Sequence, residues 1–243
     1  MADRNKPLIL LIAPAIVIVI ISLLLPPIPQ PQTYHNFADQ RGWLGIPNFG
    51  DVISNVPFAI VGIWGSVALF TPGKTKFLDS RERWLYLVIF SALILTAWGS
   101  AYYHLEPNNA RLVWDRIPIN IVFMALLSAV IAECVKVGAG LALFPLLELV
   151  GVASVLYWHA SELQGRGDLR FYAAVQVYAI LILLLALLLP AKYTRGSDFV
   201  IVVGFYVLAK MPACHQMHES SAFPRQLRLH GTLLAGCRTL LPP

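Results

Sequence analysis

The sequence predicts an all-α protein, a polytopic bundle of transmembrane helices, and three observations support this prediction. Of the 243 residues, 58% are hydrophobic and only 13% are charged, whereas soluble domains average about 25% charged residues. The uncharged runs are continuously apolar and approach the roughly 20 residues that a helix needs to cross a bilayer. Strands of a membrane barrel would instead alternate apolar and polar residues over about ten positions. These features exclude a soluble globular protein, a disordered chain and a nucleic-acid-binding module as first interpretations.

The first apolar run, residues 9–25, is followed by four closely spaced prolines. A basic flank precedes it, as in a signal peptide, but the run is long and no small-residue cleavage site follows. We therefore expect residues 1–30 to form an uncleaved N-terminal membrane anchor. Five further spans are expected, and they cover residues 52–70, 84–103, 117–135, 138–158 and 171–189.

A seventh apolar run begins at Phe199, but only eleven uncharged residues precede Lys210. After Lys210 no run is long enough to cross a membrane. We therefore divide the chain into the anchor, a multi-spanning membrane domain over residues 31–210, and an aberrant polar tail over residues 211–243.

The distribution of Lys and Arg between the loops predicts the orientation in the membrane. Loops on the side of the N-terminus carry nine of these residues, and loops on the other side carry five. Because positive loops stay in the cytoplasm, we expect a cytoplasmic N-terminus, and the same bias accounts for the net charge of +5. The segments 30–51, 104–116 and 159–170 would then gather at the outer face.

A cluster of side chains suited to metal binding or catalysis lies where the third span ends and the fourth begins. Ser100 and His104 are four residues apart, so their side chains share one helical face. A short loop then leads to Asp115, and a hairpin of neighbouring helices would bring the three side chains together. Imidazole and carboxylate are zinc ligands, and a hydroxyl beside them can stabilise an oxyanion. A catalytic zinc needs about three protein ligands, and this hairpin offers two.

Each of these residues also has a purely structural interpretation. His104 at a helix end is typical of an amphipathic boundary residue, and Asp115 could complement the dipole of its helix. Ser100 could bond to a carbonyl of its own helix. Spacing alone favours these structural roles over a metal site.

The sequence Gly-Ser-x-x-x-His, followed after ten residues by Asp-x-x-Pro, resembles the alkaline ceramidase family of intramembrane zinc amidases. Within that superfamily, which includes the adiponectin-type receptors, the chain is most similar to the bacterial alkaline phytoceramidase-like branch. A second similarity runs from Asn48 to Asn55, and a softer one runs from Gly167 to Tyr172. The resemblance covers roughly residues 35–210.

The resemblance implies a seven-helix core, here with an extra N-terminal helix, and a zinc ion held by three histidines in a cavity open to lipid. It implies a hydrolase of linear amide C–N bonds that acts on ceramide or phytoceramide-like membrane lipids. His104 would be a Zn²⁺ ligand, Asp115 would bind the metal or its water, and Ser100 would stabilise the oxyanion. It also implies a bacterial inner-membrane protein, and the loop charges would put the site near the outer face.

The calcium site of the family is matched less well. Asn48 stands where eukaryotic members carry an acidic residue, and the preceding acidic run is reduced to Asp39. Because Ca²⁺ prefers six to eight oxygen ligands, several of them anionic, Asp39 and Asp51 are more simply a solvated loop residue and a helix N-terminal residue.

The C-terminal tail departs from the family pattern. The resemblance predicts a final helix carrying His-x-x-x-His, and no such pair is present. The tail holds three of the six histidines, His215, His218 and His230, and two of the three cysteines. We therefore expect a frameshifted or otherwise altered C-terminus that leaves the chain short of zinc ligands and inactive.

Two other classes of protein remain open. The first is a non-catalytic multi-spanning receptor or scaffold that keeps the helical hairpin. The second is a small transporter in which Glu133 and Glu148 line a pathway, although the paired discontinuous helices typical of transporters are not visible. His159 follows two aromatic residues and is most simply an interfacial residue.

Overall fold

The computed structural model describes residues 6–36, 40–73, 77 and 79–186, and in these ranges the regular structure is helical, with no strand. The helices, in chain order, are α1 (Lys6–Leu24), η1 (Gln32–His35), α2 (Phe49–Ile53), α3 (Val56–Phe70), α4 (Glu82–Leu105), α5 (Asn109–Cys134), α6 (Val137–Leu163) and α7 (Arg170–Ala186). The predicted all-α fold class is confirmed.

Four helical stretches are long and apolar enough to cross a membrane. They are Phe49–Phe70, which combines α2 and α3, Glu82–Leu105, Asn109–Cys134 and Val137–Leu163. α1 and α7 are apolar but shorter within the described residues. A helical membrane bundle is therefore supported. The complete seven-helix core stays a prediction, because the run from Phe199 and the tail after residue 210 lie outside the described residues.

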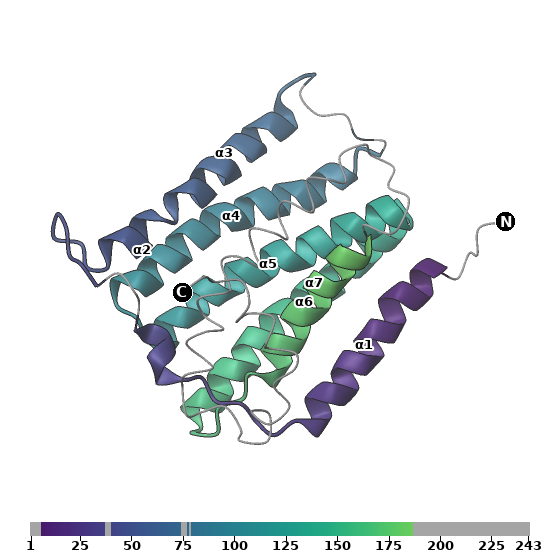
Figure 1. The fold of residues 1–243 in the computed structure, drawn as a ribbon. Helices are drawn as coiled ribbons and strands as arrows, with labels where there is room; N and C mark the ends of the chain where they lie inside the picture. Colours follow the sequence, from purple (N-terminus) through teal and green to yellow (C-terminus); the bar gives the residue numbers. More distant parts are fainter. Residues whose placement is uncertain (1–5, 37–39, 74–76, 78, 187–243) are drawn as a thin grey trace, which may run out of the picture.

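From α3 to α6 the helices follow one another side by side in chain order, as Figure 1 shows. α3 packs on α4, α4 on α5, and α5 on α6, while α7 contacts both α5 and α6. α1 packs against α7, at the opposite edge of the bundle from α3. α5 is thus the central helix, and 67% of its apolar window is buried.

Glycines allow the helices to approach closely. A Cβ on Gly62 of α3 would lie 2.6 Å from the backbone oxygen of Phe90 on α4. A Cβ on Gly140 of α6 would lie 2.5 Å from the backbone oxygen of Ser128 on α5. Small residues at helix crossings are typical of membrane bundles, where packing rather than hydrophobic burial holds the helices together.

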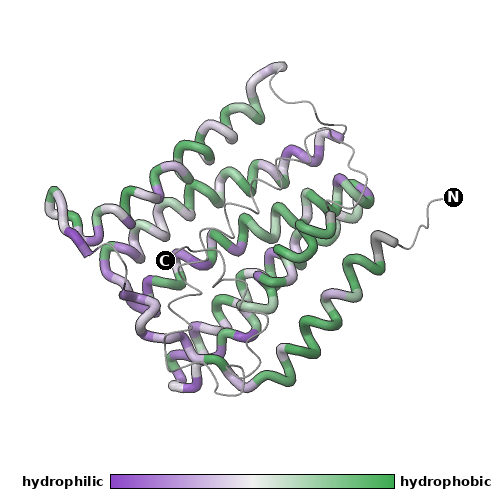
Figure 2. The backbone as a smooth tube through the Cα atoms, in the orientation of Figure 1, coloured by the Kyte–Doolittle hydropathy of each residue, from purple (hydrophilic) through white to green (hydrophobic). Residues whose placement is uncertain are grey.

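Large apolar side chains cover the outside of the bundle. Trp64 on α3 and Trp98 on α4 are 73% and 74% exposed. Figure 2 shows apolar residues along the lengths of the helices and hydrophilic residues toward their ends. An apolar exterior with polar ends is what a lipid environment requires.

The predicted fourth span started eight residues too late. We expected it at residue 117, because Arg111 and Arg116 were taken as loop charges, whereas α5 begins at Asn109. The side chain of Asn108 caps this helix by accepting a hydrogen bond of 2.9 Å from the backbone N–H of Arg111. The cap satisfies one of the first backbone donors and extends the helix beyond its apolar part.

A buried polar cluster joins α5, α6 and α7 at the centre of the bundle. Asn120 of α5 donates to the backbone oxygen of Gly151 (2.9 Å) and to the hydroxyl of Ser154 (3.1 Å), both on α6. It accepts a hydrogen bond from the side-chain amide of Gln176 on α7. Because Asn120 and Ser154 are fully buried, these bonds fix the register of α5, α6 and α7.

Candidate functional site

The segments that connect the helices meet at one end of the bundle. The side-chain amide of Asn48 donates to the backbone oxygen of His104 at 2.8 Å. A ring nitrogen of His35 lies 2.8 Å from the side-chain oxygen of Asn109. The backbone N–H of Gln30 donates to Glu162 at 2.8 Å. The predicted gathering of the segments 30–51, 104–116 and 159–170 is confirmed, and the side of the membrane on which they lie stays a prediction.

The end of α4 lies directly against the beginning of α5. A Cβ on Gly99 would be only 2.0 Å from the backbone oxygen of Trp114 and 3.4 Å from the backbone nitrogen of Asp115. Ser100, the next residue along α4, is buried with 7% of its surface exposed. The absence of a side chain at residue 99 therefore lets α4 and α5 approach closely at the level of Ser100 and Asp115.

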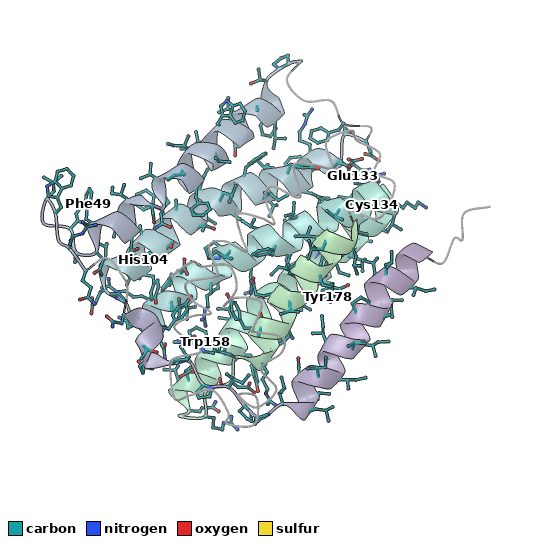
Figure 3. The ribbon with its side chains drawn as sticks, in the orientation of Figure 1. Phe49, His104, Glu133, Cys134, Trp158 and Tyr178 are labelled. Atoms are coloured by element: carbon teal, nitrogen blue, oxygen red, sulfur yellow. The ribbon has the colours of Figure 1, made fainter. Side chains whose placement is uncertain are left out.

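His104 lies in the last turn of α4 and is half-buried. The carboxylates of Asp115 on α5 and Asp51 on α2 both interact electrostatically with its imidazole. Figure 3 shows the labelled His104 at the end of α4, close to the start of α2, where Phe49 is labelled. One imidazole thus lies within the field of two carboxylates that come from two other helices.

Asp115 does not act as an N-terminal residue of its helix. Because α5 begins at Asn109, Asp115 is the seventh residue and lies beyond the first turn. The favourable interaction of an acid with the helix dipole falls off within that first turn. This weakens the dipole interpretation of Asp115 and leaves its interaction with His104 as the better-supported one.

The candidate metal ligands at this end of the bundle have the right chemistry for zinc, but among the described residues there are too few of them. Within residues 6–36, 40–73, 77 and 79–186, no group of three or more His, Cys, Asp or Glu side chains could hold a metal ion. His104 and Asp115 offer the imidazole and carboxylate that Zn²⁺ accepts. The other candidate ligands, His215, His218 and His230, lie outside the described residues.

The segment that resembles the calcium site has a structural role. Asn48 is held in the left-handed region, at φ 48°, and its amide bonds to the carbonyl of His104. Asp51 interacts with the His104 imidazole, and Asp39 lies outside the described residues. The segment therefore docks α2 against the end of α4.

Glu162 forms a second polar cluster at the same end. Its carboxylate accepts hydrogen bonds from the Trp158 indole (3.2 Å), the Asn109 side chain (3.3 Å) and the Gln30 backbone (2.8 Å). These partners come from α6, α5 and the segment after α1. Glu162 was expected in the outer segment 159–170, but it lies in the last turn of α6, and its connection of three parts of the chain was not predicted.

Arg116 is buried beside this cluster, with only 5% of its surface exposed. Its guanidinium lies 4.1 Å from the ring centre of Trp158, 4.6 Å from that of Tyr172 and 5.7 Å from that of Tyr34. It also donates to the side chain of Gln30 at 2.6 Å. Its interpretation as a loop charge was therefore wrong, because Arg116 lies inside α5.

The segment Gly167 to Tyr172 holds the end of α1. Arg170 donates to the backbone oxygen of Leu25 at 2.6 Å, and Asp168 accepts two hydrogen bonds from its guanidinium, at 2.8 and 2.9 Å. The hydrogen bond from Arg170, together with the hydroxyl of Tyr157, holds the pKa of Asp168 below its usual value although the residue is buried. A positive charge at the C-terminal end of α1 also complements its dipole.

His159 follows Trp158 of the Glu162 cluster in α6. Its ring lies beside Trp158, with 6.1 Å between the ring centres, and its Nδ1 makes no hydrogen bond within the described part of the chain. The role of His159 as an interfacial residue stays a prediction.

Comparisons of the chain with protein-family models, with curated proteins and with solved structures found no match.

Proposed function

We propose that this chain belongs to the class of integral membrane amide hydrolases that use zinc, with ceramide or phytoceramide-like lipids as substrates. The observation that carries the proposal is the close approach of α4 and α5 at Gly99 and Trp114. This contact brings together the part of α4 that carries Ser100 and His104 and the part of α5 that carries Asp115. These three are the residues of the ceramidase-like pattern.

The side chains of this hairpin suit hydrolysis of an amide. His104 and Asp115 would hold the ion, and the chemistry that Zn²⁺ supplies in such a site is activation of water and polarisation of a carbonyl. Ser100 would donate a hydrogen bond to the oxygen of the scissile carbonyl as negative charge develops on it. The carboxylate of Asp115 would also accept a hydrogen bond from the attacking water and orient it.

The position of the hairpin suits a lipid substrate. The candidate residues lie where membrane-length helices end, beside exposed apolar surfaces. A ceramide-like molecule has apolar chains that remain in the bilayer and a polar amide near its boundary. We place the site at the outer face of a bacterial inner membrane with a cytoplasmic N-terminus, as the loop charges favour.

We further propose that this chain is inactive, because the sequence supplies no His-x-x-x-His pair to complete the zinc site. The tail after residue 210 would be the product of an altered reading frame. The encoding DNA tests this: a second frame past codon 210 that encodes an apolar helix with His-x-x-x-His would support it, and a DNA sequence without one would contradict it.

The function is tested by zinc analysis of the purified chain beside a version in which residues 211–243 are replaced by an apolar helix bearing His-x-x-x-His. We expect stoichiometric zinc and ceramide hydrolysis in the restored version and neither in the present chain. His104→Ala should abolish both in the restored version, whereas the matched control His159→Gln should keep both. A restored version without stoichiometric zinc would overturn the hydrolase proposal.

A non-catalytic receptor or scaffold is the second candidate. It is supported by the hydrogen bond from Asn48 to His104 and the contact at Gly99, which join α2, α4 and α5 through protein groups alone. The same zinc measurement separates the two candidates, because a scaffold needs no stoichiometric metal.

A further inference from the structure

The segment between α1 and α2 is built into the end of the bundle that carries the candidate site. The backbone N–H of Leu169 donates to the backbone oxygen of Ile28 at 2.8 Å. A Cβ on Gly167, whose φ is +53°, would meet the side chain of Pro29 at 2.8 Å. Gln30 is bonded on one side to Glu162 and on the other to Arg116. We call residues 26–36 the connector.

His35, at the end of the connector, bridges α4 and α5. Its Nδ1 lies 2.8 Å from the Tyr103 hydroxyl, and its Nε2 lies 2.8 Å from the side-chain oxygen of Asn109. Since an amide oxygen only accepts, Nε2 carries the hydrogen and donates to Asn109. Nδ1 is then the acceptor and receives the hydrogen of the Tyr103 hydroxyl. The two bonds select one neutral tautomer of His35.

The bond to Asn109 is itself fixed by its surroundings. The amide nitrogen of Asn109 donates to Glu162 at 3.3 Å, which orients the amide oxygen toward His35. Burial lowers the pKa of His35, and the nearby Arg116 lowers it further, while Asn109 and Glu162 act in the opposite direction. The net effect lowers the pKa of His35, which favours the neutral form that its role as an acceptor requires.

Tyr103 transmits this arrangement to the candidate site. It is 2% exposed, and its ring centre lies 5.2 Å from that of the adjacent His104. The backbone oxygen of the same His104 accepts the bond from Asn48. The last turn of α4 is therefore held on two sides, by His35 through Tyr103 and by Asn48 through the backbone.

We infer that His35 is a positioning residue: by accepting the hydrogen bond of Tyr103, it fixes the last turn of α4 so that His104 faces Asp115. The connector is then part of the site's architecture. The use of the positioned imidazole in hydrolysis rests on the proposed function. The positioning itself is a property of the folded chain and is measured without zinc or substrate.

The test uses the full chain in detergent micelles with ¹⁵N-labelled histidine, and the readout is the pair of ring-nitrogen signals of His104 at neutral pH. His104 is assigned from the signals lost in His104→Gln. Two substitutions separate the two bonds of His35. His35→Asn can place an oxygen near the former Nδ1, so it keeps an acceptor for the Tyr103 hydroxyl. His35→Gln places its amide near the former Nε2, so it keeps the hydrogen bond to Asn109 and loses the one from Tyr103.

We expect His35→Gln to move the His104 signals and His35→Asn to leave them close to wild type. Tyr103→Phe should move them in the same way as His35→Gln, and the double variant should add nothing, since both remove one bond. His159→Gln, a histidine change at the same end, should leave them in place.

Unmoved His104 signals in both His35→Gln and Tyr103→Phe would overturn the inference, even if both variants lowered thermal stability. If His35→Gln does not fold, Tyr103→Phe alone decides, because it removes the same bond from the other side. A missing zinc ion in the restored version would overturn the proposed function and leave this result unaffected.

Discussion

The backbone oxygen of Trp114 occupies the space into which a side chain at Gly99 would point, with only 2.0 Å between that oxygen and a Cβ on Gly99. No side chain of an L-amino acid fits at this distance without moving the backbone of one helix. The contact sets the spacing of α4 and α5 at the level of Ser100, and with it the approach of His104 to Asp115.

Gly99→Ala should therefore destabilise the protein by forcing α4 and α5 apart. We expect a cost of about 1–3 kcal/mol, typical of overpacking a tight contact, and a lower unfolding midpoint in detergent. Gly138→Ala is the matched control, because a Cβ at Gly138 meets no atom within 4 Å. Equal midpoints for the two variants would show that the helices do not meet as described.

The helical hairpin was predictable because two simple signals coincide in it. Long apolar runs fixed the existence of α4 and α5, and the spacing of four residues placed Ser100 and His104 on one face. The close approach at Gly99 was not predicted, although a glycine directly before the serine is the signal that would have indicated it.

The second cluster was missed because its residues were assigned by charge rather than by helical register. Arg116 was counted among the loop charges, but a helix that starts at Asn109 places it four residues from Leu112 and from Asn120, on one face. All three are buried. The cap residue Asn108 was the local signal for that earlier start.

His35 could not be identified from the sequence at all. It lies in a short helix after a run of prolines, and its partners Tyr103 and Asn109 are 68 and 74 residues away. Contacts at such separations follow from the tertiary fold, and no periodicity in the connector reports them.

Arg116→Lys should destabilise the protein although the charge is kept. A lysine ammonium cannot reproduce the contacts of the planar guanidinium with the rings of Trp158 and Tyr172 or its hydrogen bond to Gln30. We expect a loss of about 1–3 kcal/mol, since a buried polar group would lose partners, measured as a lower unfolding midpoint in detergent. Arg81→Lys, on an exposed arginine, is the control and should leave the midpoint unchanged.

The buried cluster around Asn120 should show strong coupling between its members. Asn120→Leu leaves the amide of Gln176 without its acceptor in the bundle centre, and Gln176→Leu leaves the oxygen of Asn120 without its donor. Each should cost about 1–3 kcal/mol. The double variant should cost less than the sum of the two, because it removes both partners of the bond. Additive losses in unfolding experiments would contradict a shared hydrogen bond.

The ion pair between Asp168 and Arg170 should make the docking of α1 sensitive to acid. Arg170 lowers the pKa of Asp168 from its ordinary value of 3.8, so the folded state favours the carboxylate more than the unfolded state does. Stability from this source is present above pH 3.8 and is lost as the pH falls through the lower pKa of the folded protein.

Asp168→Asn removes this contribution while keeping the shape of the side chain. We expect the variant to be less stable than wild type near neutral pH and to lose less stability on acidification, so that the two curves converge in acid. Glu106→Gln, which breaks the exposed ion pair between Glu106 and Arg111 at the same end, controls for the loss of a negative charge and should change stability much less than Asp168→Asn, because exposed ion pairs contribute little. Because Arg170 also donates to the backbone oxygen of Leu25, Asp168→Asn should in addition speed proteolysis in the connector after α1. A constant difference between wild type and Asp168→Asn across the acid range would mean that the ion pair does not hold α1 in place.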